Sequence, residues 1–233
     1  DWLQKHRRGV APQPWTQDRQ VGELDLLRLQ TAMGFTAEDF DLIIEDMAAL
    51  GKEPTYCMGD DIPLAVLSDK PHLLYDYFKQ RFAQVTNPPI DPLREKLVMS
   101  LEMHLGERRP ALKPQPEAAS VIHLETPVLN EAELAAISEQ GLPVKTVSTQ
   151  VAVESCAGGL QQAIAALCSV AEQAVRDGAQ VLVLSDRVDG TGAAAPLTPT
   201  TVAMPALLAV GAVHHHLLRQ KLRLQCSLVV DTA

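Results

Sequence analysis

The fold of this chain is decided by one continuous apolar run, Val181-Leu182-Val183-Leu184, in its second half. A strand that is apolar at every position is typical of a parallel sheet buried on both faces. A helical pattern over 160–175 precedes the run, between Gly158-Gly159 and Gly178. A second helix is expected around 203–219. The run is therefore predicted to be a central strand between two helices.

Further strands are expected on both sides of this unit. They are Val121 to Leu124, Val144 to Val151 and Leu224 to Val230. Strands that alternate with helices predict parallel βαβ units with right-handed connections. A parallel sheet of three or four strands is either an open α/β layer or part of a barrel. The fold class predicted for this half of the chain is therefore α/β.

The first half of the chain is expected to be mainly helical. Apolar residues at helical spacing predict helices at 22–33 and 37–50. Thr36 has the character of an N-cap, and Asp39 three residues later completes a variant capping box. Two further helices are expected, at 71–84 and from Leu93 to Met103.

The chain is expected to form one domain, 1–233, with three subregions. Residues 1–106 form the mainly helical part, with an extended lead-in at 1–20. Residues 107–120 are rich in Pro, Glu, Ala and Lys and predict an exposed connection. Residues 121–233 form the parallel α/β part. The chain begins without Met and stops just after a predicted strand, so we expect it to be part of a longer polypeptide.

Composition excludes several functional classes. The hydrophobic fraction of 46% suits a soluble globular protein, and the formal net charge of −9 disfavours nucleic acid as a partner. The one basic cluster, Lys5 to Arg8, is interpreted as a solvated segment. No apolar run reaches the roughly 18 residues of a membrane helix, and no signal peptide is recognisable.

The cysteines indicate reduced thiols. They are scattered, without a C-x-x-C pair, at Cys57, Cys156, Cys168 and Cys226. This usage predicts a cytosolic or plastid-like compartment rather than a disulfide framework.

Clusters that suggest metal or acid–base chemistry fail on geometry. Consecutive helical residues point about 100° apart, so His214-His215-His216 cannot converge on one ion. We expect one inward and two solvated imidazoles there. Asp60 and Asp61 are adjacent, and a capping role is the simpler interpretation. Cys57 has no recognisable histidine partner and is interpreted as a buried structural thiol.

Two glycine-containing loops leave an alternative open. Asp186 and Asp189-Gly190-Thr191-Gly192 follow the buried strand, where parallel α/β proteins place functional loops. Gly158-Gly159 precedes a helix and could bind an anion. Neither the G-x-G-x-x-G nor the Walker pattern is complete. A tight turn and a flexible loop are the expected structures, and phosphate binding is the alternative.

Two long runs resemble the large subunit of glutamate synthases. They are Met58-Gly59-Asp60-Asp61-Ile62-Pro63-Leu64-Ala65-Val66-Leu67-Ser68 and Phe82-Ala83-Gln84-Val85-Thr86-Asn87-Pro88-Pro89-Ile90-Asp91-Pro92-Leu93-Arg94-Glu95. The later runs from Leu182 to Arg187 and from Val229 to Ala233 also fit. In order, these matches place the chain at the central domain of that family.

The resemblance implies a fold, an activity and cofactors. Family members join a glutaminase domain, a central domain, an FMN-binding synthase barrel and a β-helix. Ammonia from glutamine passes through a tunnel and combines with 2-oxoglutarate, with reducing equivalents delivered through FMN and an iron–sulfur cluster. The central domain is similar to a rudimentary, degenerate TIM barrel. Ferredoxin is favoured over a pyridine-nucleotide subunit as electron donor, and a cytoplasmic or plastid-stroma location follows.

This chain itself is expected to hold no catalytic residue, cofactor or metal. The family's glutaminase nucleophile is an N-terminal cysteine, whereas Asp1 stands here, and no closely spaced cysteines could bind a cluster. The resemblance implies instead that Met58 and Thr86 line the ammonia tunnel, while Asn87 and Asp91 hold the proline-rich loop in shape. The expected partners are the glutaminase and FMN domains. An autonomous phosphate- or flavin-binding enzyme and a pure interaction module are the rival hypotheses.

Overall fold

The computed structural model describes residues 5, 8–14, 23–50, 67, 69, 100–110, 112–113, 115–154 and 159–232. The chain divides into two compact units, one made of Asp1–Gln17 with Leu97–Ala233 and the other of Asp18–Lys96. The assignment of the whole chain to one domain with three subregions stays a prediction.

The secondary-structure elements described in the Asp18–Lys96 unit are helices. Its elements are α2 (Glu23–Ala32), α3 (Ala37–Asp39), the π-helical turn η1 (Phe40–Ile44) and α4 (Glu45–Leu50). Thr36 Oγ1 accepts a hydrogen bond from the Asp39 amide at 3.3 Å, and Asp39 Oδ2 accepts one from the Thr36 amide at 2.7 Å. The predicted capping box and the helices at 22–33 and 37–50 are confirmed, and the helix predicted at 71–84 lies outside the described residues.

Strand β2 (Met103–Leu105) replaces the end of the helix predicted from Leu93 to Met103. It pairs antiparallel with β3 (Ile122–Leu124), a strand that the sequence predicted. Residues 100–102 are not helical either, and 93–99 lie outside the described residues. The prediction was wrong here because pairing with a distant strand overrides local helical spacing.

The N-terminal segment also takes part in the structure. Strand β1 (Arg8–Gly9) pairs parallel with β3, giving a sheet of order β1-β3-β2. The Arg8 amide donates to the Val121 carbonyl at 3.2 Å, and the Arg8 guanidinium donates to the Gln140 carbonyl. Arg8 is therefore half-buried and anchored, which corrects its interpretation as part of a solvated segment, while its strand conformation agrees with the predicted extended lead-in.

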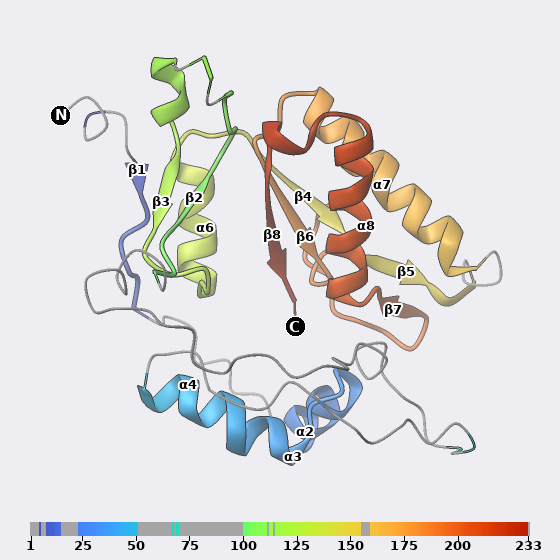
Figure 1. Ribbon diagram of the computed structural model, residues 1–233. Coiled ribbons are helices and arrows are strands. Elements are labelled where there is room, and N and C mark those ends of the chain that lie inside the picture. Colours follow the sequence, from blue (N-terminus) through green and yellow to red (C-terminus); the bar gives the residue numbers. More distant parts are fainter. Residues whose placement is uncertain are drawn as a thin grey trace. The chain divides into compact units, whose positions relative to one another are not determined.

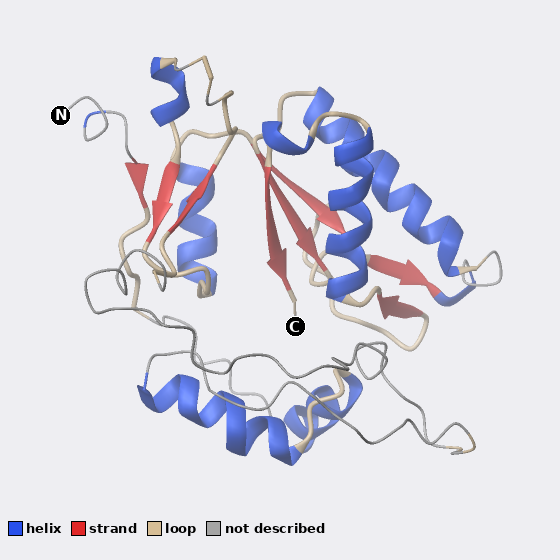
Figure 2. Ribbon diagram, viewed as in Figure 1, coloured by secondary structure: helices blue, strands red, loops and turns tan. Residues whose placement is uncertain are grey.

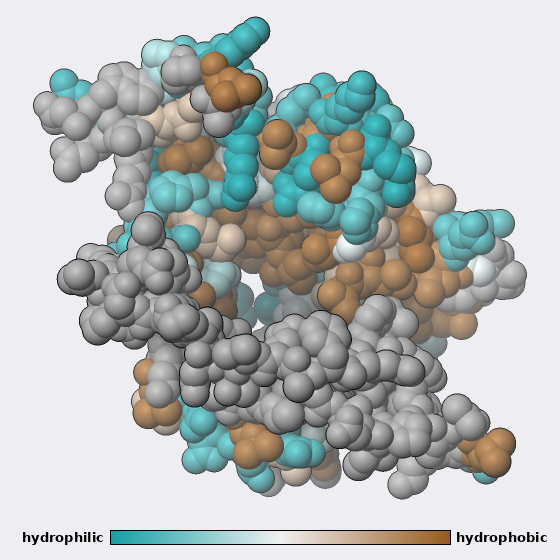
Figure 3. Space-filling view, viewed as in Figure 1, coloured by the Kyte–Doolittle hydropathy of each residue, from teal (hydrophilic) through white to brown (hydrophobic). Residues whose placement is uncertain are grey.

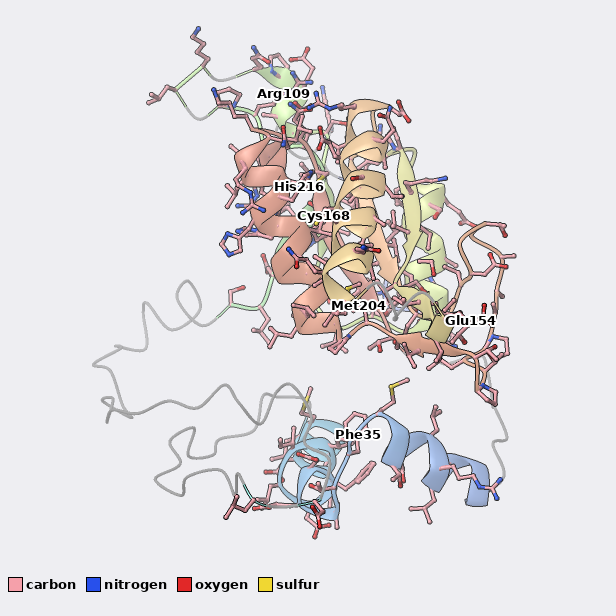
Figure 4. The ribbon with its side chains drawn as sticks, turned by 90° about the vertical axis from the view of Figure 1, so that its right-hand side faces the viewer. Phe35, Arg109, Glu154, Cys168, Met204 and His216 are labelled. Atoms are coloured by element: carbon pink, nitrogen blue, oxygen red, sulfur yellow. The ribbon has the colours of Figure 1, made fainter. Side chains whose placement is uncertain are left out.

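The main sheet has three parallel strands in the order β4-β6-β8 (Figures 1 and 2). Its strands are β4 (Val144–Ser148), β6 (Val181–Ser185) and β8 (Ser227–Asp231). Helix α7 (Leu160–Arg176) connects the first two, and α8 (Ala206–Arg219) precedes the third. Figure 4 shows these two helices side by side. The predicted parallel α/β arrangement of this half is confirmed.

Several predicted boundaries shift because the chain turns where a longer element was expected. The strand predicted at 144–151 is two strands, β4 and β5 (Gln150–Ala152), separated at Thr149. Strand β5 pairs antiparallel with β7 (Thr201–Ala203), so the predicted helix at 203–219 starts only at Ala206. Residues Arg223–Gln225 form the 3-10 turn η5, so the strand predicted from Leu224 begins at Ser227.

Two elements within 107–145 were not predicted. Helix α6 (Glu131–Glu139) begins with Asn130, whose side chain accepts from the Glu133 amide at 2.9 Å. The 3-10 turn η3 (Pro116–Ala119) lies in the expected connection, and Ala119 is buried in it. The connection is therefore exposed over most of its described length but anchored at its end.

Strand β6 separates two apolar cores. Leu182 and Leu184 face the core under α7 and α8, and Val181 and Val183 face the core that α6 shares with β2 and β3. All five residues of β6 are buried, as its uninterrupted apolar run predicted. The described strands form three separate sheets and no closed barrel, so the barrel-like part of the predicted fold stays a prediction.

Candidate functional site

The carboxyl ends of β4, β6 and β8 carry a cluster of polar side chains that contact one another. These strands are parallel and in register, so their ends lie at the same edge of the sheet. Ser148, Ser185 and Asp231 occupy the three ends. We call this place the carboxyl edge, and it is where a parallel α/β fold would build an active site.

The centre of the carboxyl edge is a hydrogen bond between neighbouring strands. Ser185 is 0% exposed, and its Oγ donates to Asp231 Oδ2 at 2.7 Å. Arg187 Nη1 lies 3.3 Å from Glu131 Oε1 and 3.6 Å from Asp231 Oδ1. The guanidinium therefore pairs with both carboxylates, and the Ser185 hydroxyl is already donated to one of them.

Asp186 is also fixed by hydrogen bonds. It is 5% exposed, and its Oδ2 accepts a hydrogen bond from Thr232 Oγ1 at 2.6 Å. Its carbonyl accepts from Gln150 Nε2 at 2.7 Å, and its amide donates to the Asp231 carbonyl at 3.2 Å. Asp186 therefore ties strand ends together instead of presenting a carboxylate to solvent.

The 189–192 loop binds its own carboxylate. Asp189 Oδ1 accepts from the Thr191 amide at 2.8 Å, from Thr191 Oγ1 at 2.6 Å and from the Ala193 amide at 3.2 Å. The Thr191 hydroxyl, then the surrounding backbone amides, hold the pKa of Asp189 below its ordinary value. A phosphate would have to displace this carboxylate and then face its charge, so the geometry disfavours the phosphate alternative for this loop.

Two hollows adjoin the carboxyl edge. One, of about 630 Å³, lies between β8 on one side and β2, β3 and α6 on the other, with Arg187, Glu131 and Asp231 among its lining residues. The other, of about 620 Å³, is lined by β4, β5, the first turns of α7 and the 189–192 loop. We call the first hollow the β8 groove.

Two of the three consecutive histidines pair with different residues. His216 pairs with Glu172 of α7 at 2.6 Å, and His214 Nδ1 accepts from Arg223 Nε at 3.0 Å. His215 is exposed, whereas His214 and His216 are half-buried, which corrects the expectation of one inward and two solvated rings. Figure 4 labels His216 on α8 and Cys168 on α7. Within the described ranges, no group of His, Cys, Asp and Glu is arranged to hold a metal ion.

The described cysteines are structural. Cys168 and Cys226 are both free thiols and both buried, and burial raises the pKa of each. A raised pKa keeps the thiol protonated and therefore a poor nucleophile or ligand. These two residues confirm the prediction of reduced thiols, while Cys57 and Cys156 lie outside the described residues.

The predicted tunnel residues Met58, Thr86, Asn87 and Asp91 all lie outside the described residues, as do Asp60 and Asp61. Gly159 is described and adopts φ 87° at the start of α7 without a side-chain cap, while Gly158 is not described. These candidates therefore stay predictions.

Sequence reasoning missed Arg187 and Glu131 as partners. The signal was present, since Asn130 followed by Glu133 is a capping-box pattern that predicts a helix start. A helix that starts there places Glu131 in its first turn, where its carboxylate can pair with Arg187 after the buried strand.

None of the described helices combines the length and apolar character needed to cross a membrane.

Comparison with known proteins decides the family. Residues 28–233 match the family described as "Glutamate synthase central domain". The chain belongs to the glutamate synthase central domain family. The matched range includes both long runs on which the resemblance was based, and the recognition of this family from the sequence is confirmed.

Relatives of this central domain are much longer proteins. The chain is 51% identical over its whole length to "Ferredoxin-dependent glutamate synthase, chloroplastic" of Oryza sativa subsp. japonica, and it spans 14% of that protein. It is 52% identical over 97% of its length to "Ferredoxin-dependent glutamate synthase" of Pyropia yezoensis. A Synechocystis protein, "Ferredoxin-dependent glutamate synthase 2", is 51% identical over the whole chain, which spans 15% of it.

Proposed function

We propose that this chain is the linking domain of a ferredoxin-dependent glutamate synthase, joining its glutaminase domain to its FMN-binding synthase domain. The observation that carries the proposal is full-length identity of about half to enzymes of that name, of which the chain spans only 14%. A segment of this size within a long enzyme has neighbouring domains on the same polypeptide. The parent enzyme would convert glutamine and 2-oxoglutarate, with two electrons and two protons, into two molecules of glutamate.

The described residues do not fit the parent enzyme's redox groups. FMN and an iron–sulfur cluster would supply the electrons, and a cluster is held by several deprotonated cysteines close together, whereas burial raises the pKa of both described thiols. Cys168 and Cys226 are buried, and the 189–192 loop already binds the Asp189 carboxylate. We therefore assign no redox step to the described residues, and a linking role is favoured over an autonomous flavin-binding enzyme.

The carboxyl edge supports the linking role because its polar groups are consumed by the fold. Ser185, Asp186 and Arg187 each have partners within the same unit. The parallel order β4-β6-β8, with helices between the strands, also suits a degenerate relative of a barrel. We propose this ancestry for the sheet, since each of its strand ends sits where a barrel enzyme would carry its active-site loops.

The same proposal assigns the ammonia path to the loops around Met58 and Thr86. Ammonia must travel without loss to water, so its path requires walls of nearly fixed shape. Proline fixes its own backbone φ angle, so Pro88, Pro89 and Pro92 would hold the second loop in shape at little entropic cost. Asn87 and Asp91 would hold that loop in shape.

The proposal is tested in the intact enzyme by Thr86→Phe, which would obstruct the path. We expect glutamine hydrolysis to continue while the amount of 2-oxoglutarate consumed per glutamine hydrolysed falls well below one. Thr200→Phe, a matched substitution at an exposed threonine, should leave that ratio at its wild-type value. An unchanged ratio in Thr86→Phe would count against the tunnel, and an intact enzyme without glutamine-dependent glutamate formation would reject the parent activity.

A further inference from the structure

The outer edge of β8 has backbone groups that nothing among the described residues pairs. The Ser227 amide donates to the Gln180 carbonyl at 2.9 Å, and the Asp231 carbonyl accepts from the Asp186 amide at 3.2 Å. Since pairing alternates along a parallel strand, Ser227, Val229 and Asp231 face β6. The amides and carbonyls of Leu228 and Val230 therefore point away from the sheet.

This edge forms one wall of the β8 groove. At the start of β8, the Ser227 hydroxyl accepts from the Gly106 amide at 3.0 Å and donates to the Gly106 carbonyl at 3.2 Å. The Arg108 amide also donates to the Leu224 carbonyl, at 2.7 Å. β8 and the continuation of β2 are thus joined at one end, and towards the other end the two strands diverge (Figure 1). The groove of about 630 Å³ lies between them.

Most of the residues that line the groove are apolar. It is lined by side chains such as Met103, Leu134, Leu228 and Val230, and Figure 3 shows an apolar area over β8. Val230 is 42% exposed although it belongs to the sheet. An exposed edge strand is a site at which other strands add, and proteins usually block such edges with charged side chains, especially Lys, or with Pro. The one charged residue of β8, Asp231, stands at its last position.

The opposite edge of the same sheet is blocked in that way. Strand β4 carries Lys145, which is exposed, whereas β8 has no Lys, Arg or Pro. The two edges belong to one sheet and have equal strand lengths of five residues. The β8 edge therefore combines open backbone groups with the β8 groove and has no lysine to block it.

A small anion is a poor occupant of the groove. Arg187 is the one cation among the groove's lining residues, and it is already paired with Glu131 and Asp231. These three groups together carry one net negative formal charge. The chemistry left for an occupant is that of apolar side chains and of a backbone that can pair with Leu228 and Val230.

We propose that an extended apolar segment from another part of the parent polypeptide adds to the outer edge of β8 and fills the β8 groove. This inference rests on the proposed function, since relatives of which the chain spans 14% contain ample further sequence. The added strand would pair with two amides and two carbonyls of β8, those of Leu228 and Val230. Strand addition of this kind gains affinity from the backbone and specificity from the side-chain pockets.

Residue-resolved hydrogen exchange on the intact parent enzyme tests the proposal. The Leu228 and Val230 amides should exchange at least about 100-fold more slowly than unstructured amides, and the Val229 amide, which faces β6, should serve as the protected reference. The protection should not change on tenfold dilution of the enzyme. Fast exchange at Leu228 and Val230 would overturn the proposal, and loss of their protection on dilution would assign the edge to a second copy and overturn it as well.

A proline variant separates the added strand from general effects on the sheet. Val230→Pro removes an amide that points away from β6, and the Leu228 amide should then exchange at least about tenfold faster. Thr146→Pro is the matched control at the opposite edge of the sheet. The Thr149 amide donates to the Ser185 carbonyl, so Thr149 faces β6, and by the same alternation the Thr146 amide points away from β6. Unchanged protection of Leu228 in Val230→Pro overturns the proposal, while the Thr86→Phe ratio tests the linking function separately.

Discussion

The polar groups at the carboxyl end of β8 have partners, whereas the backbone groups along its outer edge have none among the described residues. At the carboxyl end, Asp231 accepts from Ser185 and neighbours Arg187, and Thr232 donates to Asp186. Along the outer edge, the backbone groups of Leu228 and Val230 have no described partner, and apolar side chains surround them. One strand thus joins a closed polar network to an open apolar groove.

The difference indicates what kind of work the domain does. Catalysis by an α/β fold needs polar groups left available at the carboxyl ends of its strands. Here those groups satisfy one another, and what is left available is backbone and apolar surface, which suits docking. The comparison therefore supports a domain that positions its neighbours.

The largest expected effect is a difference in stability between a variant in the buried core and one at the outer edge of β8. Leu182 is 0% exposed in the core under α7 and α8, so Leu182→Ala should lower the free energy of unfolding by about 2–5 kcal/mol. Val230→Ala at the open edge should change it by less than about 1 kcal/mol. Urea denaturation of the chain measures both. Similar losses in the two variants would mean that β8 is not open.

Breaking the closed network should have a smaller effect. Asp231→Ala removes the acceptor of the buried Ser185 hydroxyl, which should lower the free energy of unfolding by about 1–3 kcal/mol. Asp231→Asn retains an acceptor oxygen and should lose less. The same denaturation experiment distinguishes them, and equal stability of Asp231→Ala and wild type would show that the network is not needed.

A still smaller effect is expected in the 189–192 loop. The Thr191 hydroxyl is the first cause of the lowered pKa of Asp189, so Thr191→Ala should raise this pKa towards its ordinary value. Because the folded-state pKa is depressed, Asp189 stabilises the fold above its unfolded-state pKa, and this contribution is lost as pH falls through the folded-state value. An NMR titration of the Asp189 carboxyl measures the shift, and an unchanged pKa would contradict the hydrogen-bond assignment.

The sequence predicted those parts of the fold whose signals are local or strongly periodic. The uninterrupted run at Val181 identified β6, and the spacing over 160–175 identified α7. Thr36 and Asp39 correctly marked a helix start. Strand β2 could not be predicted, because its three residues become a strand only through pairing with Ile122–Leu124, which local sequence does not encode.

The candidate site was predictable in position but not in character. Asp186 and the 189–192 loop were correctly expected to follow the buried strand. That Asp189 binds its own loop, and that Thr232 binds Asp186, depends on side-chain positions that residue spacing does not fix. The β8 groove depends on the divergence of two strands more than 100 residues apart in sequence, and its open edge has no local sequence signal.

The central claim is that the carboxyl edge of this domain is structural and supplies no reacting group. The turnover number of the intact enzyme tests it most directly in Asp186→Asn and Asp189→Asn, which keep side-chain size and remove the charge. We predict glutamate formation from glutamine and 2-oxoglutarate within about twofold of wild type, because a general acid or base contributes roughly 10²–10⁴-fold. A loss of about 100-fold or more in either variant, with the fold intact, would contradict the claim.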